Sequence, residues 1–211
     1  PDNYSLILSS LIIMVTGIAR YSDDFFATPK GRTVHMKEFR LGSVYNLELT
    51  ASPSAVIGIL LLWAVLSAVG NLLLGLTIAE AILGGLAATL LHTLGEFLHH
   101  LGHAIAARRT GYPMQGIGFG YLMLLAVSVY PFDEPELPAK THIRRALGGP
   151  PANLLSALAA GAAAILLKPT GGLWYFVAIF AFLDYFMLFL GAFVPLGFTD
   201  GNTLLDHWEK R

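Results

Sequence analysis

Long apolar runs alternate with short polar segments along the chain. The apolar runs contain few Asp, Glu, Lys or Arg residues, and each approaches the ~20 residues that a helix needs to cross the hydrocarbon core of a bilayer. This pattern predicts an all-α polytopic membrane protein with about five transmembrane helices. The predicted helices are Tyr4–Ala19, Ser54–Leu74, Thr77–Arg109, Gly148–Leu167 and Leu173–Val194.

Two segments between these runs do not fit a transmembrane helix. Arg20 to Ser52 is polar and mixed in charge, and within it Thr33–Phe39 and Ser43–Leu49 could pair as a short hairpin. Met114 to Val129 is apolar but carries several glycines at alternate positions. We therefore expect a short re-entrant or β segment there, at the membrane surface and after the third helix, instead of a sixth span.

The charged residues orient this topology. In this topology twelve of the 13 Lys and Arg residues lie on the side of the membrane that holds the C-terminus, and only Lys168 lies on the opposite side. The positive-inside rule then predicts an outside N-terminus and a cytoplasmic C-terminus. We expect the membrane to be a bacterial or archaeal cell membrane. A net charge of -1 gives no indication of a nucleic-acid partner, and the lack of cysteine excludes disulfides and thiolate metal sites.

These patterns divide the chain into three parts. Residues 1–53 are expected to hold a membrane anchor and a polar segment on the cytoplasmic side. The anchor run lacks the basic start and the cleavage site of a signal peptide. Residues 54–205 are expected to form a transmembrane core in contact with membrane lipid, and residues 206–211 a C-terminal tail.

One face of the third predicted helix carries ionisable side chains, which are costly at bilayer depth and usually mark a working site. At about 100° per residue they fall in a single 100° stripe. Two histidines at i and i+4 on such a face have the spacing that one metal ion needs, although a pair of hydrogen-bonded buried histidines is the alternative. The members of the stripe are His92, Glu96, His99, His100 and His103.

A tetrahedral metal site needs a third protein ligand. The best candidate is Asp200, which follows the fifth predicted helix on the cytoplasmic side, at the same depth as His99 and His103. The alternative is that Asp200 and Gly201 form only an Asp-Gly turn, a common use of that dipeptide.

Three motifs in this order resemble the site-2 proteases, the intramembrane zinc metalloproteases. The run His99–Ala104 reads HHLGHA, where the family has HELGHA, and Gly149–Asn153 reads GPPAN, where the family has G-P-x-x-N. Thr199–Gly201 keeps the Asp-Gly of the family's N-P-D-G segment but loses the preceding Asn-Pro. The likeness extends from about Ala79 to Leu205.

The resemblance implies a fold and a set of site residues. Three of the transmembrane helices would form a site-2-protease-like core that binds a single Zn²⁺ through His99, His103 and Asp200. Asn153 would help to hold the substrate backbone or the oxyanion, with interhelical hydrogen bonding as its alternative role. A transmembrane protein would be the substrate or the partner subunit.

The chain departs from the family at His100, where a glutamate normally takes a proton from zinc-bound water and delivers it to the leaving amine. Losing general acid–base catalysis costs a factor of about 10²–10⁴, so we expect impaired or absent peptide hydrolysis. The substitute catalytic residues would be His100 itself and Glu96, one turn earlier, which could hydrogen-bond His100.

Two further functions stay open at this point. The chain could be a non-catalytic structural or regulatory subunit that keeps the protease fold, or an active protease that uses His100 and Glu96 as its base. A two-iron histidine-box oxygenase is disfavoured, because such sites need about eight histidines and this chain has seven. Near the site, His92 and Glu96 are expected to pair with each other, and Asp184 with Asn71, Thr77 or a backbone group.

Overall fold

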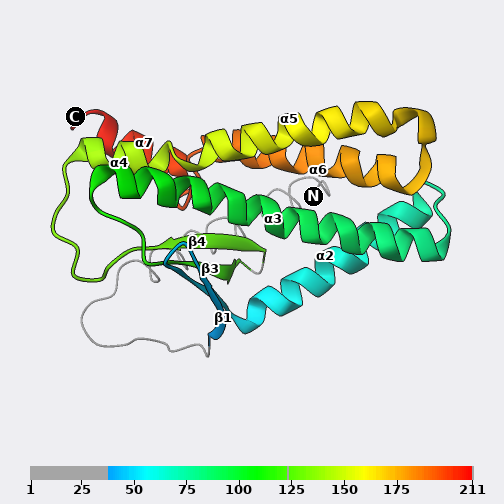
Figure 1. Cartoon of the computed structure of the whole chain (residues 1–211), viewed down its shortest axis with the longest axis horizontal. Coiled ribbons are helices and arrows are strands. Elements are labelled where there is room, and N and C mark those ends of the chain that lie inside the picture. The colour runs from blue at the N-terminus through cyan, green and yellow to red at the C-terminus, as the bar shows by residue number, and fades with distance from the viewer. Residues whose placement is uncertain (1–37, 123, 211) are drawn as a thin grey trace, which may run out of the picture.

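The long helix α3 (Ile78–Thr110) forms the centre of the molecule, with α2 (Pro53–Leu72) on one side and α5 (Gly149–Leu167) and α6 (Gly172–Gly191) on the other (Figure 1). The computed structural model describes residues 38–122 and 124–210. The expected span Tyr4–Ala19 lies outside these residues.

Each of these four helices is long and apolar enough to cross a membrane. Their bounds lie within about three residues of the runs predicted from hydropathy. At ~1.5 Å per residue the 33 residues of α3 extend for about 50 Å, well beyond the ~30 Å of a hydrocarbon core. The chain is therefore a mostly helical membrane protein in which the ends of α3 reach past the apolar layer.

Local sequence sets both ends of α3. At its start Thr77 and Glu80 form a capping box, in which the Glu80 carboxylate accepts a hydrogen bond from the Thr77 backbone N–H at 3.0 Å. At its end Gly111 adopts the left-handed conformation, with φ 85°, and its N–H bonds the Arg108 carbonyl. Arg108 and Arg109 in the last turn complement the helix dipole.

A four-stranded sheet packs beneath α3, and it is larger than the β segment that the sequence predicted. Its strands are β1 (Phe39–Val44), β2 (Leu47–Ala51), β3 (Gly116–Tyr121) and β4 (Leu125–Val129), in that spatial order. The two outer pairs are antiparallel, whereas β2 pairs in parallel with β3. The region after α3 is thus a strand pair that is completed by a hairpin from the polar segment before α2.

A hairpin is present in the polar segment before α2, but it is not the predicted pairing, and the expected first strand Thr33–Phe39 lies outside the described residues except for Glu38 and Phe39. The turn lies at Tyr45 and Asn46, inside the expected second strand Ser43–Leu49. Both residues have positive φ, 50° and 64°, which gives a two-residue turn of the kind that matches the twist of the flanking strands.

Two short amphipathic helices, α4 (Ala139–Ala146) and α7 (Asp200–Trp208), pack on each other beside the C-terminal end of α3 (Figure 1). The 3₁₀ turn η1 (Lys168–Thr170) connects α5 to α6 at the opposite end of the bundle.

Glycines allow α5 to begin directly against α3. A Cβ atom on Gly102 would collide with the Gly148 carbonyl oxygen, and one on Gly148 would lie 2.9 Å from the Cα atom of His103. This backbone contact brings the start of α5 to the histidine stripe.

Candidate metal centre

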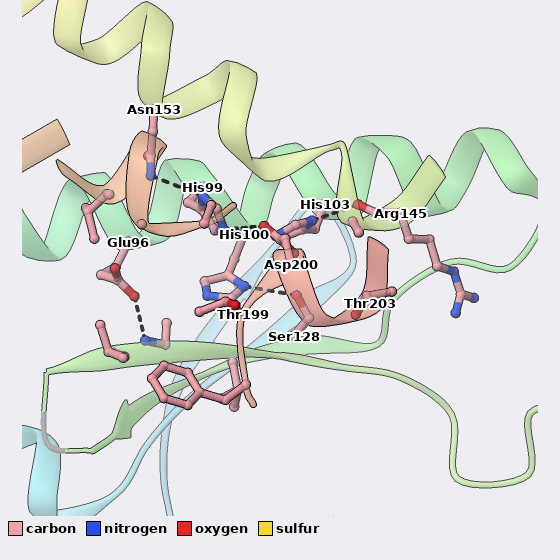
Figure 2. Close-up of a pocket in the computed structure, with 18 of the residues that line it drawn as sticks. Glu96, His99, His100, His103, Ser128, Arg145, Asn153, Thr199, Asp200 and Thr203 are labelled. Carbon is pink, nitrogen blue, oxygen red and sulfur yellow. Dashed lines mark hydrogen bonds and ion pairs between the residues drawn. The ribbon is translucent and has the colours of Figure 1, made fainter. Parts of the chain in front are cut away.

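His99, His103 and Asp200 come together although about a hundred residues separate the histidines from the aspartate (Figure 2). The His99 Nε2 and Asp200 Oδ2 atoms lie 3.3 Å apart, as do His103 Nε2 and Asp200 Oδ1. The two Nε2 atoms are 2.9 Å apart. The three side chains therefore offer one donor atom each, all within 4.8 Å of one another, and this group could hold a metal ion.

The spacing of these donors suits zinc. Bonds of ~2.0–2.1 Å to a tetrahedral Zn²⁺ place neighbouring ligand atoms about 3.3 Å apart. Both histidine–carboxylate distances match that value, and the histidine–histidine distance falls a few tenths of an ångström short. Asp200 Oδ2 is buried, and its partner among residues 38–122 and 124–210 is the ligand nitrogen His99 Nε2 at 3.3 Å, so a cation between the two atoms would satisfy both.

Backbone and amide groups orient the two imidazoles. His103 Nδ1 donates a hydrogen bond to the Arg145 carbonyl at 2.8 Å, which leaves the lone pair on Nε2 available to a metal ion. His99 Nδ1 lies 3.1 Å from the amide of the buried Asn153. If the Asn153 amide turns by 180°, its Oδ1 atom, which has no partner among the described residues, accepts the Nδ1 proton and frees Nε2 of His99.

Gly149, the first residue of α5, covers one side of the histidine pair. A Cβ atom there would lie 2.5 Å from His103 Nε2 and 2.6 Å from His99 Nε2. No other residue fits at this position, because the backbone of α5 approaches both rings directly. The Gly-Pro motif therefore shapes the metal centre sterically.

The turn after α6 places Asp200 at the start of α7. Gly197 adopts φ 92° in this turn, and the Gly201 N–H donates to the Ala192 carbonyl at 2.7 Å. A Cβ atom on Gly201 would collide with the Phe193 carbonyl. The Asp-Gly pair thus starts a helix that packs tightly on the end of α6, and it is not a free surface turn.

The charge state of Asp200 suits a metal ligand. Burial by itself would raise the pKa of the Asp200 carboxyl. Hydrogen bonds and charge attraction from His103 and His99 outweigh the burial and leave the pKa below its usual value. The carboxylate is therefore the stable form.

The two candidate bases both turn toward strand β4. His100 is buried, and its Nδ1 lies 2.9 Å from the Ser128 hydroxyl. Glu96 does not bond His100. Its carboxylate accepts a hydrogen bond from the Ala126 N–H at 2.7 Å, because the edge strand β4 presents a free backbone donor. These contacts fix the polar face of α3 to the sheet.

The expected partners of the remaining buried groups are also wrong. His92 pairs with Asp184 on α6, with His92 Nδ1 and Asp184 Oδ1 3.0 Å apart, and not with Glu96. The Asn71 amide instead donates to the Leu76 carbonyl at 2.9 Å, and Thr77 caps α3. The His92–Asp184 pair ties α3 to α6 inside the bundle and gives each ionisable side chain an opposite partner.

A cavity of about 530 Å³ opens beside the three donors, between β4 and the C-terminal part of α6. Its walls combine the polar stripe of α3 with apolar side chains. The apolar part includes Leu125, Val127, Met187, Leu188, Ala192 and Leu196.

Three residues at the centre were not identified from the sequence. Ser128 contacts His100, and Arg145 and Tyr130 line the cavity. Burial raises the pKa of the Tyr130 hydroxyl to about 12, so it stays a hydrogen-bonding group at neutral pH. Only the amphipathic pattern of the segment around Arg145 could have indicated that one of its two adjacent arginines faces inward.

Comparison with known proteins gives one structural likeness. The chain is similar to a solved structure described as the site-2 protease from Methanocaldococcus jannaschii, with a TM-score of 0.56 and 16% sequence identity over 80% of this chain and 69% of that chain. No protein-family model matches the sequence, and the search of curated proteins gives no match. The likeness establishes a site-2-protease-like fold for this membrane protein.

Proposed function

We propose that this chain is a divergent site-2 protease that binds a single Zn²⁺ through His99, His103 and Asp200, and that peptide hydrolysis is impaired or lost. The observation that carries the proposal is the convergence of these three donors within 4.8 Å, in a fold that resembles a site-2 protease. Each donor also occupies the motif position that the family resemblance assigns to a ligand.

The loss of activity follows from the contacts of His100 and Glu96, the two candidate bases beside the donors. A bound zinc ion would supply a water of lowered pKa and a Lewis acid for a peptide carbonyl. The chain would then need a base to take the proton. The His100 imidazole is engaged by Ser128 and the Glu96 carboxylate by the Ala126 backbone N–H, so the centre lacks the free carboxylate base of the family. Asn153, which touches His99, would orient that ligand and could also contact a substrate.

A non-catalytic subunit of a membrane complex is the second candidate function. It is favoured by the same two contacts, which use the polar groups of α3 to attach the sheet. In this role the cavity beside α6 would receive a transmembrane partner without cleaving it. An active protease that uses His100 or Glu96 as base is the least supported of the three.

Metal analysis of the purified protein tests the zinc site. We expect one zinc per chain after purification in detergent without chelator, and its loss on dialysis against a strong chelator. The group of donors in the described residues is large enough for one ion, so two irons per chain would contradict the proposal. A protein that stays metal-free after incubation with excess Zn²⁺ would contradict it too.

We also propose that the metal centre faces the cytoplasm. Arg108 and Arg109 lie in the last turn of α3, Arg144 lies in the last turn of α4, and Lys210 follows α7 by two residues. These elements meet at the end of the bundle that holds the centre, whereas Lys168 lies in η1 at the opposite end (Figure 1). Because the chain has no cysteine, single cysteines can report this directly. In intact cells a membrane-impermeant maleimide should label Lys168→Cys and leave Lys210→Cys unlabelled until the membrane is opened. The reverse labelling would show the opposite orientation.

A further inference from the structure

We propose that Arg145 is the positioning residue of the metal centre and couples metal binding to the loop between β4 and α4. This inference rests on the zinc site proposed above. Arg145 sits in the last turn of α4, contacts the centre through its backbone, and contacts the loop through its side chain. The Arg145 side chain holds the end of α4 in position, and the Arg145 carbonyl in turn orients the His103 ring.

The Arg145 backbone contacts the metal centre through its carbonyl oxygen. The Arg145 carbonyl, at the end of α4, accepts the Nδ1 proton of His103 at 2.8 Å and the Gly148 N–H at 2.9 Å. Carbonyls at a helix end have no partner within the helix, and here the Arg145 carbonyl accepts from both the His103 ring and the Gly148 backbone. Gly148 precedes Gly149, whose backbone covers both imidazoles. A shift of this single carbonyl would therefore move a ligand ring and the wall beside it.

The side chain locks that carbonyl in place. Arg145 is only 5% exposed, although it carries a full charge. Its guanidinium donates to Glu134, with Nη1 and Oε2 2.9 Å apart, and to the Tyr112 carbonyl at 2.7 Å. It also lies 4.2 Å from the centre of the Tyr130 ring. The planar fork of an arginine can make these contacts at once, and a lysine cannot.

Through these contacts Arg145 ties the loop Pro131–Pro138 to the centre. Glu134, within this loop, forms an ion pair with Arg145, and the hydrogen bond from Arg145 lowers the pKa of the Glu134 carboxyl. Phe132, two residues away, is fully exposed. If the ordered position of the loop favours the metal-binding position of His103, bound metal must favour the ordered loop to the same extent, because coupling is reciprocal.

The neighbouring Arg144 provides a matched control. It lies in the same helix and carries the same charge, but it is exposed. We would compare Arg145→Gln, Arg145→Lys, Glu134→Gln and Arg144→Gln in the full chain, in detergent. Zn²⁺ affinity would be measured by competition with a chromophoric chelator. Cleavage by chymotrypsin after Phe132 would be measured with and without Zn²⁺, and the melting temperature of the metal-free protein would report folding.

We expect Arg145→Gln to weaken Zn²⁺ binding by about 10–100-fold, the usual effect of removing a group that orients a ligand. Glu134→Gln and Arg145→Lys should weaken it in the same direction, and Arg144→Gln should match wild type. Zn²⁺ should slow cleavage after Phe132 in wild type and Arg144→Gln, and much less in the other variants. A merely structural role would change the melting temperature and would leave the effect of Zn²⁺ on cleavage intact.

Each result is decisive. Wild-type Zn²⁺ affinity in Arg145→Gln, or an undiminished effect of Zn²⁺ on cleavage in Glu134→Gln, overturns the proposal. If Arg145→Gln does not fold, Arg145→Lys and Glu134→Gln give the same test. If the wild-type protein binds no Zn²⁺, the proposed zinc site is wrong and the coupling falls with it. If the wild-type protein and Arg145→Gln bind Zn²⁺ equally well, only the role of Arg145 is wrong.

Discussion

Replacing Asp200 with alanine is expected to abolish stoichiometric zinc binding. The carboxylate supplies the third donor at 3.3 Å from each Nε2, and two histidines alone leave half of a tetrahedral site without protein ligands. Removing an outer group that orients a ligand already costs about 10–100-fold in affinity, so losing the ligand itself should cost more than about 100-fold. Equilibrium competition with a chelator of known affinity measures the loss.

Asp206→Ala is the control for this substitution. Asp206 lies on the same helix, α7, and is exposed, so its removal should leave zinc binding at the wild-type level. Equal zinc affinity in Asp200→Ala and Asp206→Ala would show that the carboxylate at the start of α7 is not a ligand. Thermal melting of the metal-free proteins separates loss of the ligand from loss of the fold.

The second large effect is expected at His100. We expect His100→Glu to gain peptidase activity by about 10²–10⁴-fold over wild type, because a carboxylate base beside the proposed zinc ion would restore proton transfer. The assay is cleavage of a model transmembrane helix in detergent or liposomes, followed by product mass.

Two further variants make the gain interpretable. His100→Gln should stay inactive, because an amide cannot accept the proton. Adding Asp200→Ala to His100→Glu should remove the gained activity. If wild type already cleaves the substrate and Asp200→Ala stops it, the chain is an active protease and the impairment proposed above is wrong. If His100→Glu binds zinc but gains nothing, the non-catalytic subunit is the better description.

The four long apolar helices were predictable because hydropathy is a strong, local signal, whereas the three donors were predictable only from helical spacing, topology and the family motifs taken together. Hydropathy predicted the ends of α2, α3, α5 and α6 to within about three residues. The stripe on α3 followed from helical spacing, and charge bias put Asp200 at the depth of His99 and His103. Two weak arguments, spacing and depth, thus pointed to one group of side chains, and the structure brings them together.

The sheet and the outer contacts were not predictable in the same way. The parallel pairing of β2 with β3 joins Glu48 to Gly116, across the whole of α2 and α3, and no local pattern encodes it. The partner of Glu96 is a backbone N–H of that sheet, so it could not be found without the pairing. Arg145 has the same residue type as its exposed neighbour Arg144, and only packing distinguishes them.

The close approach of Gly149 to both imidazoles makes access to the centre one-sided. The main chain of α5 occupies the space behind the rings, and α7 brings Asp200 against the two nitrogen atoms. A water molecule, a peptide carbonyl or the zinc-binding group of an inhibitor must therefore arrive through the cavity between β4 and α6. If zinc binds at this centre as proposed, small hydroxamates that enter from this direction would probe its remaining coordination position, and a bulky chelator would have to extract the ion along the same route.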